Sequence, residues 1–444
     1  MPRMNPFRPN SPVAPGMFVG RLPQVAAFEA ALLQTRAGRS KSFMITGERG
    51  IGKTSLLQYF KWVAQGHIAI EGEKMTFLVL ELDVDASTTD LGLIRRAELG
   101  LKRELAKTEP ARSFLASGWG FLKRIEAFGV SVRDDERASD PETLHDEFAH
   151  SLAMTANRIA QSDAPSVFGA IYDGVILLID EADNAPKGLR LGSFLKLLTE
   201  RIQRHGCQQF MVGLAGMPSL REVLRESHAS SLRIFDELPL DPLSRDEAGM
   251  VIDRALAEAN KENLEKTSID HAGRAGLITL SEGYPHFIQQ FGYSAFAADT
   301  DLVIDREDVY RGSFGPLGAM EKIGDRYYRD DFYNKIQQDS YRRVLRIMAD
   351  NENRWVSKHD IRAKFRGKTT TLDNALHALR ERKIILAKEG ERGMYRLQHR
   401  AFAFWIRLYT TDPREIQTQL ETTPEGGEAG AEQEDTADGA SRRT

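Results

Sequence analysis

Eight consecutive residues carry the strongest chemical signal in this 444-residue sequence. Residues 47–54, GERGIGKT, fit the pattern GxxxxGK[ST], in which glycines let successive backbone N–H groups turn toward phosphate oxygens. A helix that follows directs the partial positive charge of its N-terminus to the same place. Lys53 would reach the β- and γ-phosphates of ATP, and the Thr54 hydroxyl would bind Mg²⁺. The predicted phosphate-loop contacts are Gly47, Glu48, Arg49, Gly50, Ile51, Gly52, Lys53, Thr54 and Ser55.

A second motif supplies the carboxylates that hydrolysis needs. Residues 175–179, VILLI, read as a buried strand, and two acidic residues follow at the end where open α/β sheets bind ligands. We expect Asp180 to hold Mg²⁺ through its water shell and Glu181 to polarise the attacking water, with Lys53 as its catalytic partner. The alternative is an acidic pair that merely caps a strand. Asp183 and Asn184 come next, and the sequence gives them no role.

Alternating strands and helices must position these two motifs. Short apolar or β-rich runs predict strands at 42–45, 75–84, 175–179 and 210–214. Helical periodicity appears at residues 24–35 and again directly after the phosphate loop, at 54–63. This alternation predicts an α/β fold, a P-loop NTPase parallel sheet sandwiched by helices.

The remaining patterns divide the chain into further segments. A long, mostly helical stretch at about 85–170, with a turn or hairpin around 129–133, is an insertion in the sheet domain because it exceeds a simple crossover. Residues 243–314 are helical again and are interrupted at Gly283 and Pro285. The expected organisation is a flexible lead at 1–16, an ATPase domain at 17–242, a helical lid and linker at 243–330, a winged helix at 331–412 and a disordered acidic tail at 413–444.

Composition narrows the setting in which this chain works. Hydrophobic residues make up 41% of the chain and charged residues 28%, an ordinary globular composition. The single cysteine, Cys207, excludes an intramolecular disulfide and opens an apolar run, so we expect it in the core. No run approaches the ~20 apolar residues that cross a bilayer. We therefore expect a cytoplasmic protein with no membrane partner.

The last ordered segment has the pattern of a winged helix. Helices are predicted at 340–349, after an N-cap at Ser357, and at 369–382, and a two-stranded wing at 384–387 and 394–397. Residues 341–412 hold seventeen Lys and Arg against eight Asp and Glu, a net charge of +9 on a chain whose total is −4. Such a concentration suggests contacts to the phosphates of double-stranded DNA. The candidate DNA-binding residues are Thr370, Thr371, Asn374, His377 and Arg380 on the third helix, and Lys388 and Arg392 at the wing tip.

Several short motifs in a fixed order resemble a known group of proteins. Residues 18–21 (FVGR), the phosphate loop, the Asp180-Glu181 strand, residues 238–243 (LPLDPL) and 283–285 (GYP) together resemble the AAA+ and STAND ATPases, particularly those near the origin-recognition initiators. The resemblance covers about residues 17–314 and extends more weakly into the C-terminal domain. It implies that Phe18, Val19, Gly20 and Arg21 lie over the adenine, that Pro285 contacts the base or ribose, and that His286 lies near the β-phosphate. An ordinary helix lead-in and a helix-breaking turn are the plainer interpretations of the first and last motifs.

The same resemblance implies catalysis between subunits. Arg221, Arg225 and Arg233 fall where related ATPases carry an arginine finger, and we favour Arg233 over a surface role. Two departures from the family pattern matter. Residues 213–218, GLAGMP, lack the polar residue that usually senses the γ-phosphate, and the lid lacks its usual arginine, with His286 nearest to that place. Both losses fit the slow turnover of a STAND switch.

The leading hypothesis is an ATP-dependent switch whose nucleotide state controls a DNA-binding winged helix and whose subunits associate when ATP is bound. The alternative is a nucleotide-gated scaffold for signalling or defence, in which the winged helix contacts a partner protein. A transposition or conjugation ATPase would share the same site and differ in its partner.

Overall fold

The computed structural model describes residues 3–12, 18–123, 141–336, 338–351, 354–382, 384–388 and 390–410. The chain divides into two compact units, and the boundary lies between Ile323 and Gly324. Unit 1 contains the sheet domain and a helical lid, and unit 2 contains the basic C-terminal region. The turn expected around 129–133 and the tail after residue 412 lie outside the described residues.

A five-stranded parallel sheet forms the centre of unit 1, in the order β2-β3-β4-β1-β5. Its strands are β1 (Ser42–Gly47), β2 (Phe77–Asp83), β3 (Gly174–Asp180), β4 (Phe210–Gly216) and β5 (Phe235–Leu240). The sequence predicts the four strands β1 to β4, and the parallel fold is confirmed. The fifth strand went unpredicted because it lies at the sheet edge, alternates between buried and exposed residues and contains Pro239, which only an edge strand tolerates.

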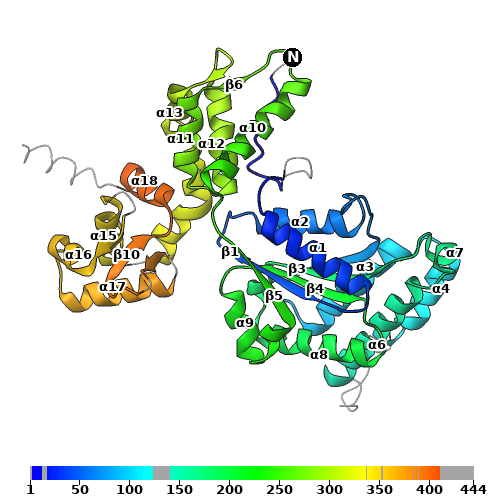
Figure 1. Ribbon diagram of the computed structural model, residues 1–444. Helices are drawn as coiled ribbons and strands as arrows, with labels where there is room; N and C mark the ends of the chain where they lie inside the picture. The colour runs from blue at the N-terminus through cyan, green and yellow to red at the C-terminus, as the bar shows by residue number, and fades with distance from the viewer. Residues whose placement is uncertain are drawn as a thin grey trace, which may run out of the picture. The chain divides into compact units, whose positions relative to one another are not determined.

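Helices cover both faces of this sheet, as Figure 1 shows with α1 and α2 on one side and α8 and α9 on the other. The helices of the sheet domain are α1 (Leu22–Arg36), α2 (Lys53–Ala64), α3 (Asp90–Leu105), α4 (Glu109–Gly118), α6 (Pro141–Ile159), α7 (Ala164–Phe168), α8 (Leu191–Arg204) and α9 (Leu220–Ser227). Between residues 141 and 336 the sheet domain also has the short 3₁₀ turns η2 (Ala182–Asn184), η3 (Lys187–Leu189) and η4 (Ser231–Ile234). The sheet and its helices thus form the three-layer arrangement expected of a P-loop NTPase.

The inserted helices α3, α4, α6 and α7 extend the core of the sheet domain. Trp119 and Phe148 are almost fully buried, and their rings meet edge to face at 5.8 Å. The Trp119 indole N–H donates a hydrogen bond of 3.2 Å to the Thr155 hydroxyl, which satisfies its one buried donor. The predicted helix from Pro141 is therefore part of the same hydrophobic core as the sheet.

The lid is a helical bundle that follows β5. It consists of α10 (Arg245–Glu262), α11 (His271–Ser281), α12 (Pro285–Ala298), α13 (Arg306–Phe314) and α14 (Ala319–Ile323), with a two-stranded ladder of β6 (Ser268–Ile269) and β7 (Val303–Ile304). A capping box of Ser244 and Glu247 starts α10. The break predicted at Gly283 separates α11 from α12, whose first residue is Pro285, where the missing N–H has no cost.

The N-terminal segment, expected to be a flexible lead, lies along the lid at residues 3–12 (Figure 1). Arg3 forms an ion pair with Asp299 and stacks its guanidinium 4.2 Å from the Phe296 ring. Phe7 is only 1% exposed because it packs against Gly292, where a Cβ would come within 2.5 Å of its ring. The segment, which we call the arm, is therefore a fixed part of the lid.

The described part of unit 2 contains three α-helices, a small antiparallel sheet and a further helix. The elements are the π-helical turns η5 (Gly324–Tyr328) and η6 (Asp331–Lys335), then α15 (Asp339–Ala349), β8 (Val356–Ser357), α16 (Lys358–Lys364), α17 (Thr369–Glu381), β9 (Ile385–Ala387), β10 (Met394–Leu397) and α18 (Arg400–Tyr409). The sheet order is β8-β10-β9, so a third strand that the sequence did not predict joins the predicted wing. The three helices α15, α16 and α17 and the pair β9-β10 are those that the sequence predicts for this segment.

The unpredicted helix α18 completes the core of unit 2. Its Trp405 is 1% exposed and meets Phe332 edge to face at 5.7 Å, and its Phe402 lies 4.6 Å from Tyr328. These aromatic contacts join the end of the unit to its first turns.

No helix in the described part of the chain is long and apolar enough to span a bilayer. Cys207 lies in the core as predicted, and burial raises the pKa of its thiol to about 11, so it remains a thiol at neutral pH.

Candidate nucleotide site

The phosphate loop joins the end of β1 to the start of α2. Gly50 and Gly52 have φ of 80° and 99°, a left-handed backbone that favours glycine and lets the loop curl. Helix α2 begins at Lys53, so its free N–H groups face the inside of the loop. The Lys53 ammonium donates to the carbonyls of Gly47 and Glu48, each at 3.0 Å. The loop therefore holds its own lysine where a phosphate would sit.

The carboxylates of β3 lie directly beside this loop. The Thr54 hydroxyl donates to Asp180 Oδ2 at 2.7 Å, which joins two residues 126 positions apart. Glu181 follows in a left-handed conformation with φ of 50°, an uncommon state for a side chain other than glycine. Its carboxylate accepts a hydrogen bond from the Asn184 amide at 3.2 Å and is exposed to solvent. Thr54 and Asp180, the predicted Mg²⁺ ligands, and Glu181, the predicted base, thus lie at the same edge of the sheet.

The donor set at this edge fits Mg²⁺. A hydroxyl and a carboxylate oxygen already in contact are the hard oxygen ligands that this ion prefers, and the ion keeps several waters of its own. Thr54 is exposed and Asp180 is half-buried, so those waters have room.

The electrostatics of the loop centre on Lys53. Burial lowers the pKa of Lys53, and the negative charges of Asp183, Asp180, Glu181 and Glu48 act in the opposite direction, Asp183 most strongly. A cation surrounded by these carboxylates and by loop carbonyls is well placed to meet an anionic ligand such as a triphosphate.

Asp183 is a site residue that the sequence left without a role. Its Oδ1 accepts a hydrogen bond of 2.9 Å from the backbone N–H of Met217, the first residue after β4. The neighbouring Gly216 pairs with Thr46 of β1, which precedes the phosphate loop. The signal was an acidic residue three positions after Asp180, and its partner could not be predicted because Met217 follows a different strand, β4.

The lid meets the phosphate loop at the Gly283–Pro285 turn. The Tyr284 hydroxyl donates to Glu48 Oε2 at 2.5 Å, and the His286 backbone N–H donates to the Gly50 carbonyl at 3.2 Å. Pro285 lies above Gly52, where an added Cβ would be 3.6 Å from its Cγ. Pro285 and His286 are therefore brought to the loop, as predicted residues of the site, and Tyr284 is an additional contact.

Residues 18–21 run between the phosphate-loop helix and the lid. The Phe18 ring stacks on Tyr59 of α2 with 4.7 Å between centroids, and its carbonyl accepts from Arg254 of α10 at 3.3 Å. Arg21 is buried and donates to the carbonyls of Asp241 at 2.5 Å and Ile51 at 3.1 Å. Burial lowers the pKa of Arg21, with Glu247 and Asp241 opposing that effect. Arg21 thus braces the phosphate loop from behind with its side chain.

The three arginines considered as fingers differ in their surroundings. Arg221 donates to both carboxylate oxygens of Glu237, at 2.8 and 2.9 Å, so it is engaged within its own subunit. Arg225 on α9 and Arg233 on η4 are exposed.

The seven candidate DNA-binding residues lie on α17 and the wing of unit 2. Thr370, Asn374, His377 and Arg380 are exposed on α17, and Thr371 is half-buried on the same helix. On the wing, Lys388 pairs with Glu391 at 2.5 Å and Arg392 is exposed. His377 and Arg380 also line a hollow of about 140 Å³ with Lys358, Asp373, Leu376 and Tyr395.

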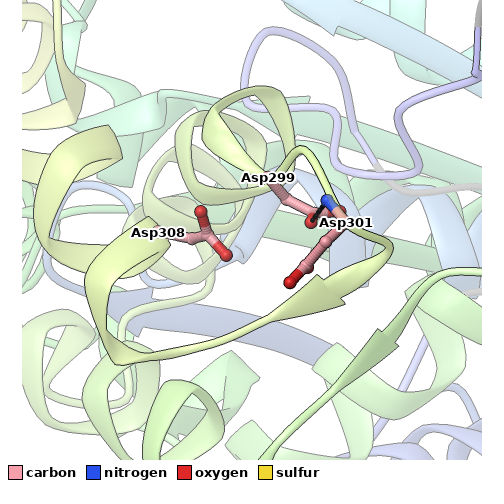
Figure 2. Close-up of side chains that lie close together, drawn as sticks. All are labelled: Asp299, Asp301 and Asp308. Carbon is pink, nitrogen blue, oxygen red and sulfur yellow. Dashed lines mark hydrogen bonds between the residues drawn. The ribbon is translucent and has the colours of Figure 1, made fainter.

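A group of three carboxylates in the lid, Asp299, Asp301 and Asp308, resembles a metal site (Figure 2). Its members are already used by the fold. Asp299 Oδ1 accepts the backbone N–H of Asp301 at 3.1 Å and Asp299 pairs with Arg3, while Asp308 pairs with Arg311 at 2.6 Å. We therefore assign the cluster to the anchoring of the arm and the start of α13.

Comparison with known proteins agrees with this geometry. Residues 17–207 match the family described as the AAA ATPase domain. No curated protein matches the chain.

One solved structure shares the fold over most of the chain. The Aeropyrum pernix ORC2 protein in ADPNP-ADP complexes is 16% identical, with 91% of this chain and 96% of that chain covered at a TM-score of 0.51. Its ADP form is 15% identical, with 94% and 98% covered at a TM-score of 0.47. Cdc6p from Pyrobaculum aerophilum is 12% identical, with 94% and 98% covered at a TM-score of 0.41.

Proposed function

We propose that the chain binds ATP with Mg²⁺ and hydrolyses it slowly, on the premise that residues 17–207 match the AAA ATPase domain family. The observation that carries the proposal is the contact between Thr54 and Asp180 beside Lys53, which gathers a hydroxyl, a carboxylate and an ammonium at one edge of the sheet. This is the set that phosphoryl transfer requires.

Each residue has a distinct task in this proposal. Lys53 leaves the carbonyls of Gly47 and Glu48 and binds the β- and γ-phosphates. Thr54 and Asp180 would hold Mg²⁺, which would supply positive charge to offset that of the phosphates. Glu181 orients and deprotonates the attacking water once its side chain leaves Asn184.

The lid would sense which nucleotide is bound. Tyr284, Pro285 and His286 contact the phosphate loop itself, so a phosphate that moves Lys53 or Glu48 also changes the position of α12. Residues 18–21 link the same loop to α10 on the other side. Two routes from the loop to the lid support a switch whose state follows the nucleotide.

We propose that ATP-bound subunits associate and that Arg233, or Arg225 in its place, reaches the site of the neighbouring subunit. Arg221 is the weaker candidate because its charge is already paired with Glu237. Turnover is slow in this proposal because residues 213–218 offer no polar side chain to the γ-phosphate.

For unit 2 we propose a winged helix that binds duplex DNA and whose availability follows the nucleotide state. The support is the net charge of +9 over residues 341–412 and the exposure of the polar face of α17. A partner protein in place of DNA is the second candidate, since an exposed polar face also suits a protein contact. The proposed location is the cytoplasm.

Two measurements test the proposal. Phosphate release from ATP in the presence of Mg²⁺ should be detectable, with a turnover rate below about 10 s⁻¹, a typical enzyme rate. A gel shift with duplex DNA should show binding at about 50 mM salt that weakens steeply by about 200 mM. Absence of binding at the lower salt would remove DNA in favour of a protein partner, and absence of any hydrolysis would remove the ATPase.

A further inference from the structure

Asp183 connects two strands at the edge of the nucleotide site. It lies in η2, three residues after Asp180, and its Oδ1 accepts the Met217 N–H at 2.9 Å. The contact is so close that a Cβ on Gly216 would come within 2.7 Å of the same oxygen. A glycine is therefore required at the end of β4 for Asp183 to reach the backbone there.

The strand that Asp183 holds is the neighbour of the phosphate-loop strand. Gly216 pairs with Thr46, and the next residue of β1 is Gly47, the first of the loop. Met217 also begins the turn into α9, which carries Arg221 and Arg225. Asp183 thus contacts the segment that connects β4, the neighbour of the phosphate-loop strand, to α9.

The charge of Asp183 acts on the loop itself. Its negative charge acts on the Lys53 ammonium, together with the charges of Asp180, Glu181 and Glu48. Within the described residues its second oxygen, Oδ2, accepts no hydrogen bond, so that charge is not neutralised by a neighbouring donor.

We propose that Asp183 is a positioning residue of the ATPase site, which fixes the end of β4 beside the phosphate loop and places a negative charge near Lys53. Its contact is with the end of β4, where residues 213–218 offer no polar side chain of their own. The inference rests on the proposed ATPase function and adds to it a residue that acts through Lys53 and Met217.

The test compares three variants of the full chain. Asp183→Ala removes both the hydrogen bond and the charge, Asp183→Asn keeps an acceptor for Met217 but removes the charge, and Gly216→Ala forces Asp183 away from β4. Gly188→Ala is the matched control, because a Cβ there meets nothing within 4 Å. Turnover of ATP and the Kd for ADP are measured for each, with thermal unfolding as a check on folding.

We expect Asp183→Ala and Gly216→Ala to lower turnover by roughly 10- to 100-fold, the loss that follows from removing a charge-assisted hydrogen bond. Asp183→Asn should recover part of that loss. The Kd for ADP, which has no γ-phosphate, should change by less than about threefold, because the effect acts through the γ-phosphate position. Gly188→Ala should match the unaltered chain.

Three results would overturn the inference: unchanged turnover in Asp183→Ala, full activity in Asp183→Asn, or a loss of turnover that only follows a loss of ADP affinity and folding. Lys53→Ala separates this failure from failure of the proposed function. If Lys53→Ala still binds ATP normally, the ATPase proposal itself is wrong; if it does not, only the role of Asp183 is at stake.

Discussion

The nucleotide edge of unit 1 and the polar face of α17 in unit 2 differ in how their side chains are held. At the nucleotide edge, Lys53 is fixed by two carbonyls and Thr54 by Asp180. On α17, Asn374 and His377 are exposed and face solvent. The side chains of the first region are held by hydrogen bonds of the fold, from which Lys53 moves only when ATP binds, whereas these side chains of α17 are open to solvent.

This difference explains why the first region permits a chemical proposal and the second only a choice between partners. When the fold fixes the positions of charged groups, those positions indicate where the opposite charges of the ligand will lie. An exposed basic surface predicts only that its partner carries negative charge.

The largest expected effect tests the fixed region. Glu181→Gln removes the base and keeps the shape of the side chain, so turnover should fall by roughly 10²- to 10⁴-fold while ATP affinity is retained. Phosphate release and equilibrium binding measure the two quantities. Glu222→Gln, an exposed carboxylate on α9, is the control and should leave turnover unchanged. Normal turnover in Glu181→Gln would show that Glu181 is not the base.

A second effect asks whether the arm belongs to the fixed region. Phe7→Ala empties a buried position against Gly292 and should lower the free energy of unfolding of unit 1 by about 3 kcal/mol. Urea unfolding measures the change. Leu264→Ala in the lid is the control because Leu264 is 88% exposed, so its loss should stay within about 0.5 kcal/mol. Equal losses in both variants would mean that the arm is not anchored.

A third effect tests unit 2, where a fixed core underlies the exposed face. Burial and, after it, the charge of Arg396 lower the pKa of His399 to about 3. The unfolded chain binds a proton near pH 6.5 that the folded unit rejects, so stability is full above that pH and is lost as pH falls toward 3. At pH 5 the loss should be about 2 kcal/mol.

Hydrogen exchange of the α18 amides between pH 7 and 5 measures this loss. His399→Gln should flatten the dependence on pH, and His377→Gln, at an exposed position, should not. Equal slopes for the unaltered chain and His399→Gln would contradict the assignment.

The smallest effect concerns the exposed region. Arg392→Ala should weaken binding to duplex DNA by a similar factor for any sequence and reduce the slope of log K against log salt by about 1, if the wing contacts one phosphate. Titration at several salt concentrations measures the slope, with Glu222→Gln as the control. An unchanged slope would place the DNA contact elsewhere.

The parts of the fold that sequence predicts are those with strong local patterns. The inner strands β1, β3 and β4 are buried on both faces and therefore appear as continuous apolar runs. The edge strand β5 and the two-residue strand β8 lack such a run, and they were missed. Only pairing with β1 and β10 makes them strands.

The site follows the same division. The loop at residues 47–54 could be predicted because the spacing of its glycines and lysine determines how the backbone turns around a phosphate. The partner of Asp183 was not predictable, since Met217 lies 34 residues away at the end of β4. Nor was the arm, whose Arg3 contacts Asp299 across 296 residues. Contacts of that kind depend on the fold, and no local pattern records them.

The central claim is that the loop at residues 47–54 binds the phosphates of ATP through Lys53. The most direct test is equilibrium binding of ATP with Mg²⁺ to the unaltered chain and to Lys53→Ala. The account predicts that the variant loses affinity by about 100-fold or more, because the ammonium and its charge-assisted hydrogen bonds to the phosphates are gone. Equal affinity in the two proteins would contradict it.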